Sequence, residues 1–326
     1  MARDHGFHPI RIKRIIQETA DTRTYVLDAP FDYQAGQFLT FKVCGTLRSY
    51  SMSSSPATDP ELTTTVKRVP GGLVSNWMHD NLSPGDLLEA TPPAGVFCLR
   101  ETSAPLVAFS GGSGITPVLS LVKTALAATD RRVRLLTADR DGDSIIFEAT
   151  LAQLAERYPG RLEVRHHLDS LAGFLTEARV KEFAADARDA DFYICGPEPF
   201  MDLVERALLA QGADPGQLFI ERFGSGDDGA PGEETEGTVT IVLSGKTHTV
   251  PQHSGETLLQ SARRAGLAPP FSCEAGNCAT CIAQVTEGRA QMKINNALDE
   301  DEVADGWVLT CQGEPATPHL TVVYED

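Results

Sequence analysis

No apolar stretch of this sequence approaches the roughly 20 residues that a membrane-spanning helix needs. The N-terminus, Met-Ala-Arg-Asp-His-Gly, also lacks the apolar core of a signal peptide. Basic residues are few, because 28 Lys and Arg face 45 Asp and Glu, and the net charge of −17 argues against binding to nucleic acid or to an anionic membrane surface. We therefore expect a cytoplasmic protein that neither binds nucleic acid nor inserts into a membrane.

The sequence also lacks an even set of cysteines, and the odd count of 7 disfavours a complete disulfide framework. Three of the cysteines are scattered, and of these Cys44 and Cys98 are expected to be packing residues. The other four all follow residue 272. In a reducing compartment, such a concentration of cysteines is typical of a metal site.

The pattern of apolar residues predicts several domains. Residues 1–102 contain short apolar runs broken by Pro, Gly and Asp, which is typical of an antiparallel barrel or sandwich. Residues 103–224 alternate buried runs with helix-length segments, which predicts an α/β domain with a parallel sheet. Residues 225–236 are acidic and rich in glycine and read as a flexible linker, and residues 237–326 mix strands with one helix in a small α+β unit.

Within these domains, the sequence pattern predicts four helices and one late strand individually. Helices are expected over 118–128, 147–158 and 200–211, with a further helix over 257–265 and a late strand over 320–323. His166 and His167 have no Cys or acid at ligand spacing, so we interpret them as structural residues.

The four C-terminal cysteines have a specific spacing, Cys-x4-Cys-x2-Cys followed by 29 residues and a fourth Cys. The predicted metal ligands are Cys273, Cys278, Cys281 and Cys311. Zinc is the alternative, but zinc sites more often use a second short Cys or His pair, whereas this spacing is that of plant-type [2Fe–2S] clusters. Gly276 would let the loop adopt positive φ and bring backbone N–H groups near the sulfurs. Residues 238–326 thus resemble a plant-type ferredoxin domain of the β-grasp kind.

Two motifs in the first domain point to a flavin. Arg48-Ser-Tyr-Ser51 combines a cation for a pyrophosphate, an aromatic ring for an isoalloxazine face and a hydroxyl for a ring nitrogen. The second motif, within residues 66–77, is Gly-Gly-x-x-Ser-Asn-Trp, whose backbone N–H groups could face a phosphate. Together they resemble the flavin barrel of the ferredoxin–NADP reductase superfamily, with an FAD-type loop. The resemblance implies FAD contacts at Arg48, Ser49, Tyr50, Ser51, Val66, Lys67, Gly72, Leu73, Val74, Ser75 and Phe223.

The α/β domain carries a nucleotide loop and a strand-end turn. Residues 111–117, Gly-Gly-Ser-Gly-Ile-Thr-Pro, follow an apolar strand, and their glycines would allow close approach of a phosphate while Thr116 caps the next helix. Residues 191–197 end a strand in Cys-Gly-Pro at the edge where parallel sheets bind ligands. Both stretches resemble the pyridine-nucleotide site of the same reductases. The expected NAD(P)H contacts are Gly112, Gly114, Thr116, Asp139, Arg140, Cys195, Gly196 and Pro197.

Nucleotide preference and hydride transfer depend on a few of these residues. Asp139 and Asp141 would accept hydrogen bonds from a ribose and repel a 2′-phosphate, so NADH is favoured, while Arg140 leaves NADPH as the alternative. Residues 220–223 resemble the family's last reductase strand, in which an acid assists the hydride site. The resemblance therefore suggests Ser51, Cys195 and Glu221 as catalytic residues.

The domain order resembles that of the reductase components of bacterial multicomponent oxygenases, of the 3-ketosteroid 9α-hydroxylase and phenylacetyl-CoA oxygenase type. This resemblance implies FAD, a [2Fe–2S] cluster and NADH as cofactors and a terminal oxygenase as acceptor, expected to be Rieske-type. A di-iron monooxygenase, a desaturase and a cytochrome P450 are alternatives, and a zinc-stapled, non-catalytic interaction protein is the alternative of another class. The last 102 residues hold 5 Lys and Arg against 16 Asp and Glu, so we expect the acidic ferredoxin end to dock the partner. The reductase itself is expected to be a monomer.

Overall fold

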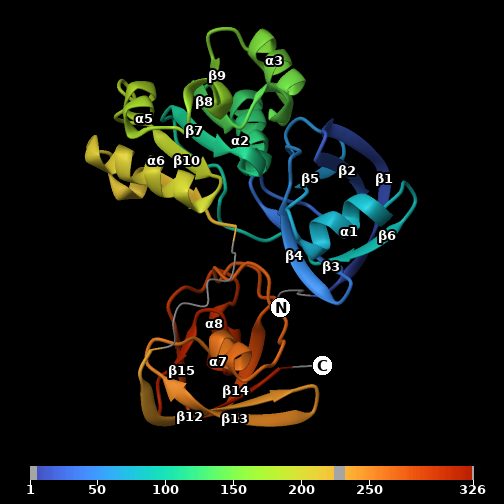
Figure 1. The fold of residues 1–326 in the computed structure, drawn as a ribbon, viewed down its shortest axis with the longest axis vertical. Helices are drawn as coiled ribbons and strands as arrows, with labels where there is room; N and C mark the ends of the chain where they lie inside the picture. The colour runs from blue at the N-terminus through green and yellow to red at the C-terminus, as the bar shows by residue number, and fades with distance from the viewer. Residues whose placement is uncertain (1–5, 224–231, 325–326) are drawn as a thin grey trace. The chain divides into compact units, whose positions relative to one another are not determined.

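The computed structural model describes residues 6–223 and 232–324 (Figure 1). The described chain forms two compact units, one of residues 9–39 and 50–222, the other of the described residues in 1–8, 40–49 and 223–326. None of the helices in the described residues is long and apolar enough to cross a membrane. Most of the expected linker, 225–231, lies outside the described residues, and a strand begins at Glu234, within the range that we expected to be linker.

The N-terminal part forms a six-stranded sheet with the strand order β4-β3-β6-β1-β2-β5, and one helix follows β5. Its elements are β1 (His8–Thr19), β2 (Thr22–Asp28), β3 (Phe38–Val43), β4 (Thr46–Ser51), β5 (Leu62–Lys67), α1 (Leu73–Asn81) and β6 (Leu87–Ala90). The β1–β2 and β2–β5 pairs are antiparallel, as the alternation of short apolar runs predicts. The fully buried side chains of Tyr25, Leu39 and Met78 belong to its core.

Cys44 corrects one sequence-based prediction. It lies at the turn between β3 and β4, where its φ of 50° and the φ of 71° at Gly45 form a left-handed turn. Its side chain is exposed, so Cys44 is not a packing residue. A tight hairpin requires positive φ at its centre, and this requirement overrides the usual burial of cysteine.

The nucleotide domain is a five-stranded parallel sheet with the order β11-β10-β7-β8-β9, which confirms the predicted α/β class. The strands are β7 (Leu106–Gly111), β8 (Val133–Asp139), β9 (Leu162–Leu168), β10 (Asp191–Cys195) and β11 (Leu218–Glu221). The helices are α2 (Ile115–Ala128), α3 (Glu148–Arg157), α4 (Asp169–Ala172), α5 (Glu177–Phe183) and α6 (Glu198–Ala210). Helices α2 and α3 pack on one face, whereas α5 and α6 cover the other (Figure 1).

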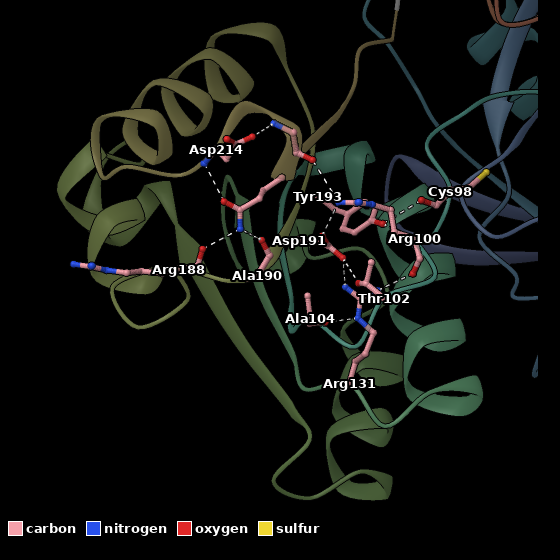
Figure 2. A network of polar contacts seen from close by, with 12 residues as sticks. Cys98, Arg100, Thr102, Ala104, Arg131, Arg188, Ala190, Asp191, Tyr193 and Asp214 are labelled. Carbon is pink, nitrogen blue, oxygen red and sulfur yellow. Dashed lines mark hydrogen bonds and ion pairs between the residues drawn. The ribbon is translucent and has the colours of Figure 1, made fainter.

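A network of polar contacts holds the segment that enters this sheet (Figure 2). The hydroxyl of Tyr193 accepts from the N–H of Arg100 at 2.9 Å and donates to the carbonyl oxygen of Cys98 at 3.1 Å. The carboxylate of Asp191 accepts from Thr102 Oγ1 and from Arg131 Nη2, each at 2.7 Å. Because the Arg131 and Asp191 side chains are only 1% and 4% exposed, this ion pair is buried and fixes the start of β7 and β10.

The C-terminal domain is a mixed sheet with the order β13-β12-β18-β14-β16, beside a two-stranded β15-β17 ladder. Its elements are β12 (Glu234–Leu243), β13 (Lys246–His253), α7 (Leu258–Arg264), β14 (Ile282–Glu287), β15 (Ala290–Met292), α8 (Glu300–Ala304), β16 (Trp307–Leu309), β17 (Gly313–Pro315) and β18 (His319–Val323). A capping box of Thr257 and Gln260 starts α7, and Leu258 and Ala262 of this helix belong to the core formed with the sheet. The α+β class is as expected.

Candidate functional site

The flavin motif forms a braced loop at the start of α1. Gly71 has a φ of +73°, and Gly72 is the N-cap residue without any side-chain cap. Ser75 Oγ accepts from the N–H of Val69 at 3.1 Å, and Asn76 Nδ2 donates to the carbonyl oxygens of Val69 and Gly72 at 3.0 and 2.6 Å. The two polar motif side chains therefore shape the loop, which leaves the helix N-terminus for an anion such as the FAD diphosphate.

The other predicted flavin residues lie on β4, β5 and α1, except Phe223, which follows β11. Ser51 is 4% exposed, and its carbonyl oxygen accepts from Thr64 Oγ1 at 2.9 Å, which ties the end of β4 to β5. Tyr50 and Ser49 are half-buried and Arg48 is exposed. The side chains of Val66 and Val74 are core residues, whereas Leu73 is 59% and Phe223 is 44% exposed.

Lys67, a predicted flavin contact, also lies near the nucleotide loop. Its ammonium is 3.9 Å from Asp21 Oδ2, and a Cβ at Gly112 would lie 3.8 Å from Lys67 Nζ. The side chain thus runs from the flavin strand β5 to the nucleotide loop, where a cation is suited to a phosphate.

The nucleotide loop and the Cys-Gly-Pro turn touch backbone to backbone. A Cβ at Gly114 would lie 2.1 Å from the carbonyl oxygen of Cys195, and one at Gly196 would lie 3.0 Å from the N–H nitrogen of Gly111. Pro197 Cδ is equally close to Gly111, at 2.9 Å from the position of a Cβ. Only glycine permits this approach, and it brings two of the predicted nucleotide segments together.

Thr116 does not cap the helix as expected. Helix α2 begins at Ile115, its N-cap is Gly114, and no side chain caps it. Thr116 is 3% exposed within the first turn, because the 3₁₀ turn Gly112–Gly114 has already turned the chain into the helix. As in α1, the uncapped N–H groups suit an anion.

Three side chains are direct neighbours in the sheet, at the carboxyl ends of β7, β10 and β11. Ser110 pairs in register with Cys195, which pairs with Glu221, and all three are buried. Burial and then the charge of Glu221 raise the pKa of the Cys195 thiol well above its usual range, so it remains a neutral thiol. Ser110 Oγ is buried without a hydrogen-bond partner, and the sequence motifs did not single it out. The predicted catalytic pair Cys195 and Glu221 is thus side by side.

The end of β8 carries the residues expected to contact the ribose. Asp139 is 7% exposed, and burial raises the pKa of its carboxyl to about 6, against the opposing effects of Thr137 and Lys67. Arg140 is exposed, and its Nε donates to Asp141 Oδ2 at 2.9 Å. The turn after β8 thus combines a buried carboxyl at Asp139 with an exposed ion pair of Arg140 and Asp141.

Helix α2 also joins the nucleotide domain to the loop after β4. Ser120 Oγ donates to the carbonyl oxygen of Ser54 at 2.5 Å, and the hydroxyls of Ser55 and Thr124 are 2.6 Å apart. Lys123 Nζ lies 2.9 Å from a carboxylate oxygen of Asp59. The helix that begins at the nucleotide loop is therefore fixed to the segment that follows the flavin motif.

The four predicted ligands come together in the C-terminal domain. Cys281 and Cys311 belong to one buried core cluster, and Gln312 Nε2, next to Cys311, donates to the carbonyl oxygen of Glu274 at 2.8 Å, in the loop that carries Cys273 and Cys278. Cys273 Sγ accepts from the backbone N–H groups of Ala275 and Asn277, each at 3.4 Å. The N–H groups of this loop therefore point at a sulfur atom, as a bound anionic cluster requires.

Tight packing shapes the same loop. Glu274 has a φ of 50° and its carboxylate binds Arg263 Nη1 and Nη2 at 2.9 and 2.8 Å. Gly276 has a φ of +74°, and a Cβ there would lie 2.8 Å from the carbonyl oxygen of Ile294, so the glycine is required as predicted.

The choice between zinc and iron–sulfur rests on the spacing of the four cysteines, which is that of plant-type [2Fe–2S] clusters, in which each of two irons takes two cysteines. His166 and His167 hydrogen-bond to Thr137 Oγ1 and to the carbonyl oxygen of Gly173, at 2.8 and 2.9 Å, which agrees with structural roles.

An antiparallel flavin sheet, a parallel nucleotide sheet and a four-cysteine domain define an electron-transferring reductase fused to its own ferredoxin. Three domain families match the chain: the oxidoreductase FAD-binding domain at residues 9–98, the oxidoreductase NAD-binding domain at 109–206 and the 2Fe-2S iron-sulfur cluster binding domain at 241–316. The protein accordingly binds FAD, NADH and a [2Fe–2S] cluster, as its motifs predict.

Similar proteins share this layout over nearly their full length. The ferredoxin reductase component of 3-ketosteroid-9-alpha-monooxygenase from Rhodococcus rhodochrous is 38% identical, with 98% of each chain covered. The reductase subunit of glycine betaine monooxygenase from Pseudomonas aeruginosa is 32% identical, over 95% of this chain and 94% of its own. The solved structure of phthalate dioxygenase reductase matches with a TM-score of 0.65 and 25% identity, over 98% of each chain. This chain belongs to the family of oxygenase reductase components that carry FAD-binding, NAD-binding and [2Fe–2S] domains.

Proposed function

We propose that this protein oxidises NADH and delivers single electrons to a terminal oxygenase, in the first place one of the Rieske type. Its membership in the oxygenase reductase family and its three cofactor domains support this proposal. When bound, the flavin takes up a hydride from the nicotinamide and releases electrons singly, and the cluster carries one at a time. The observation that carries the proposal is the contact of Gly114 with Cys195, because it places the nucleotide loop beside the strand ends that would line the nicotinamide.

Two charged side chains, Lys67 and Asp139, would bind different parts of the nucleotide. Lys67 would neutralise its diphosphate, because the ammonium already lies beside Gly112, and the loop N–H groups of Gly112 and Gly114 would add hydrogen bonds. Asp139 would accept hydrogen bonds from the adenosine ribose, with Arg140 held by its neighbour Asp141. We therefore propose a preference for NADH over NADPH.

Hydride transfer would take place over the buried ends of β10 and β11. Cys195, as a neutral thiol, would pack beside the nicotinamide without attacking it, and Glu221 would orient its carboxamide. Ser51 would reach the flavin from the end of β4, while Gly196 and Pro197, which lie close to Gly111, would border the nucleotide. Since Ser51, Cys195 and Glu221 are all at most 8% exposed, little water would reach the transferred hydride.

The proposed domain organisation keeps the flavin domain over 1–102 and the nucleotide domain over 103–224. The linker, expected over 225–236, ends before β12, so the ferredoxin domain begins at Glu234 rather than at residue 237. The acidic ferredoxin end would dock a monomeric reductase onto a basic patch of the oxygenase. Helix α8 supports this, because it presents Glu300, Asp301 and Glu302 in one turn.

An absorption spectrum and one substitution with its control test the proposed function. The purified protein should show flavin and iron–sulfur absorption that NADH bleaches, and NADH should be used with a lower KM than NADPH. Cys311→Ala should lose the cluster spectrum but keep NADH-dependent ferricyanide reduction through the flavin, and Cys44→Ala should keep both, because Cys44 is an exposed turn residue. A colourless, zinc-containing protein without NADH oxidation would overturn the proposal.

A further inference from the structure

Helix α2 is mostly apolar and buried, but it carries three polar side chains in its second half. Ser120 lies three residues before Lys123 and four before Thr124, so the three side chains share one face of the helix. Ser120 is fully buried, and the other two are half-buried. Burying polar groups is unfavourable unless each finds a partner, so this face indicates a specific contact with another segment.

All three side chains bind one short segment, residues 54–59, which begins three residues after the flavin motif. Ser120 and Thr124 bind the first two residues of the segment, at 2.5 and 2.6 Å. Lys123 Nζ lies 2.9 Å from Oδ2 of Asp59, and these two side chains are only 16% and 28% exposed. We call these three contacts the α2 clamp.

The segment that the α2 clamp holds is braced by further hydrogen bonds. Asp59 Oδ2 also accepts from the N–H of Ser55 at 2.8 Å, and the carbonyl oxygen of Ser55 accepts from the N–H of Asp59 at 2.9 Å. The hydroxyls of Tyr33 and Ser54 are 2.6 Å apart, and Ser54 Oγ accepts from the N–H of Thr63 on β5 at 2.9 Å. The α2 clamp therefore fixes the helix to the flavin sheet through a well-supported loop.

Beside the α2 clamp, a groove lies between the flavin sheet and the helices α2 and α3. It has a volume of about 210 Å³, and its lining includes Glu18 of β1, Thr24 of β2 and Phe147 before α3, together with Asp59 and Lys123. A groove lined by charged and hydroxyl groups contributes little burial of apolar surface. On this side, the polar contacts of the α2 clamp thus hold the helix against the sheet.

Helix α2 connects the nucleotide loop to the flavin motif. Its first residue directly follows Gly114 of the nucleotide loop, and Ser120 lies six residues further, which is about 9 Å along the helix. The segment at the other end of the α2 clamp follows Ser51, the last residue of the flavin motif. Hydride transfer depends steeply on the distance and alignment of the reacting atoms, so a rigid link between the two sites bears on its rate.

We propose that the α2 clamp sets the approach of the nicotinamide to the flavin, and so the rate of hydride transfer, without contributing to the affinity for the nucleotide. In this step a hydride, which carries two electrons and one proton, leaves the nicotinamide and enters the flavin. Lys123 and Asp59 are positioning residues, because they act through the helix and the loop. The inference rests on the proposed function, since it requires that NADH reduces the flavin.

The test is stopped-flow reduction of the flavin by saturating NADH in the full-length holoprotein. Lys123→Met removes the charge and keeps a long side chain, so the limiting rate should fall about tenfold, since a misplacement of about 1 Å can cost about 100-fold. The Kd of ADP-ribose, measured by isothermal titration calorimetry, should not change, because this ligand lacks the nicotinamide. The charge-transfer absorbance of NAD⁺ with the dithionite-reduced flavin should weaken, because it depends on stacking of the two rings and not on turnover.

Three more variants separate positioning from stability. Lys123→Arg should restore most of the rate, because it keeps a cation within reach of Asp59. Asp59→Asn should lower the rate as Lys123→Met does, and the double variant should lower it no further, because both changes remove the same contact. Arg206→Met is the matched control, since its ion pair with Glu177 at 2.7 Å joins α6 to α5 within the nucleotide domain, and it should leave the rate unchanged.

Thr124→Val covers the case in which Lys123→Met loses FAD or fails to fold. It removes the contact with Ser55 but leaves the ion pair, so the limiting rate and the charge-transfer absorbance should fall by a smaller factor. If a folded variant with bound FAD keeps both values, the inference is overturned, even if its Tm falls, since the α2 clamp would then be only structural. A weaker binding of ADP-ribose would also overturn it. If NADH fails to reduce the flavin of the unsubstituted protein, the proposed function is contradicted instead.

Discussion

The buried contact between Arg131 and Asp191 offers the sharpest test of how the nucleotide domain is held together. We consider Asp191→Asn, which keeps the shape of the side chain and removes its charge. In the native protein, the carboxylate faces Thr102 Oγ1 at 2.7 Å, Arg131 Nη2 at 2.7 Å and Arg100 Nη1 at 3.3 Å (Figure 2). The amide of the substituted side chain would carry no charge, and its N–H group would face these donors in place of a carboxylate oxygen.

The expected loss follows from burial. Removing one partner of a buried ion pair costs about 3–5 kcal/mol, because the other charge is left uncompensated away from water. Arg131 is only 3% exposed and cannot turn to solvent. For a unit of roughly 200 residues, each kcal/mol shifts Tm by about 2–4 °C, so the apparent midpoint should fall by about 6–20 °C.

The assay is thermal unfolding of the holoprotein by circular dichroism, with stopped-flow flavin reduction by NADH at 25 °C as a second readout. Flavin reduction should slow, because Asp191 begins the strand that ends at Cys195. Arg179→Ala is the control, since its pair with Glu182 is exposed on both sides and such pairs contribute at most about 0.5 kcal/mol. A midpoint for Asp191→Asn equal to that of the control would refute the reasoning.

Three further predictions concern the nucleotide loop, pH and salt. Gly114→Ala should abolish NADH oxidation while FAD remains bound, because a Cβ would lie 2.1 Å from the carbonyl oxygen of Cys195; unchanged steady-state activity would contradict the proposed packing. Asp139, with a pKa of about 6, is ionised at pH 7.5 and about 90% protonated at pH 5, so KM for NADH should rise about tenfold over that range. This rise should vanish in Asp139→Asn, and a persistent rise would assign it to another group. Electron transfer to the oxygenase should slow as salt increases, whereas a rate independent of salt would remove the acidic end from docking.

The sequence predicted those parts of the site that depend on local geometry. The cysteine spacing and the glycine loops are short-range patterns whose chemistry follows from residue type, and the helices over 118–128 and 200–211 were found to within three residues because their apolar period is strong. Strand β13 was not predicted. It reads Lys-Thr-His-Thr-Val-Pro-Gln-His, is an edge strand without a buried residue, and so lacks the apolar run that would have revealed it.

Other features depend on tertiary contacts that no local pattern records. Lys67 belongs to a flavin motif by position, but its long side chain reaches Gly112 in the next domain. Ser110 looks like an ordinary strand residue, and only the fold shows that its hydroxyl is buried without a partner among the described residues. Cys44 was predicted to be a packing residue from its type alone, whereas the hairpin turn requires it at the surface.

The backbone-to-backbone contact between the nucleotide loop and the Cys-Gly-Pro turn has a consequence for redesign. Because Gly114 meets the carbonyl oxygen of Cys195 and Gly196 approaches the backbone of Gly111, the contact that would hold the diphosphate depends largely on main-chain atoms. Asp139, Arg140 and Asp141 lie outside that contact, at the far end of β8. Substitutions at these three positions should therefore change the preference between NADH and NADPH without weakening the binding of the diphosphate.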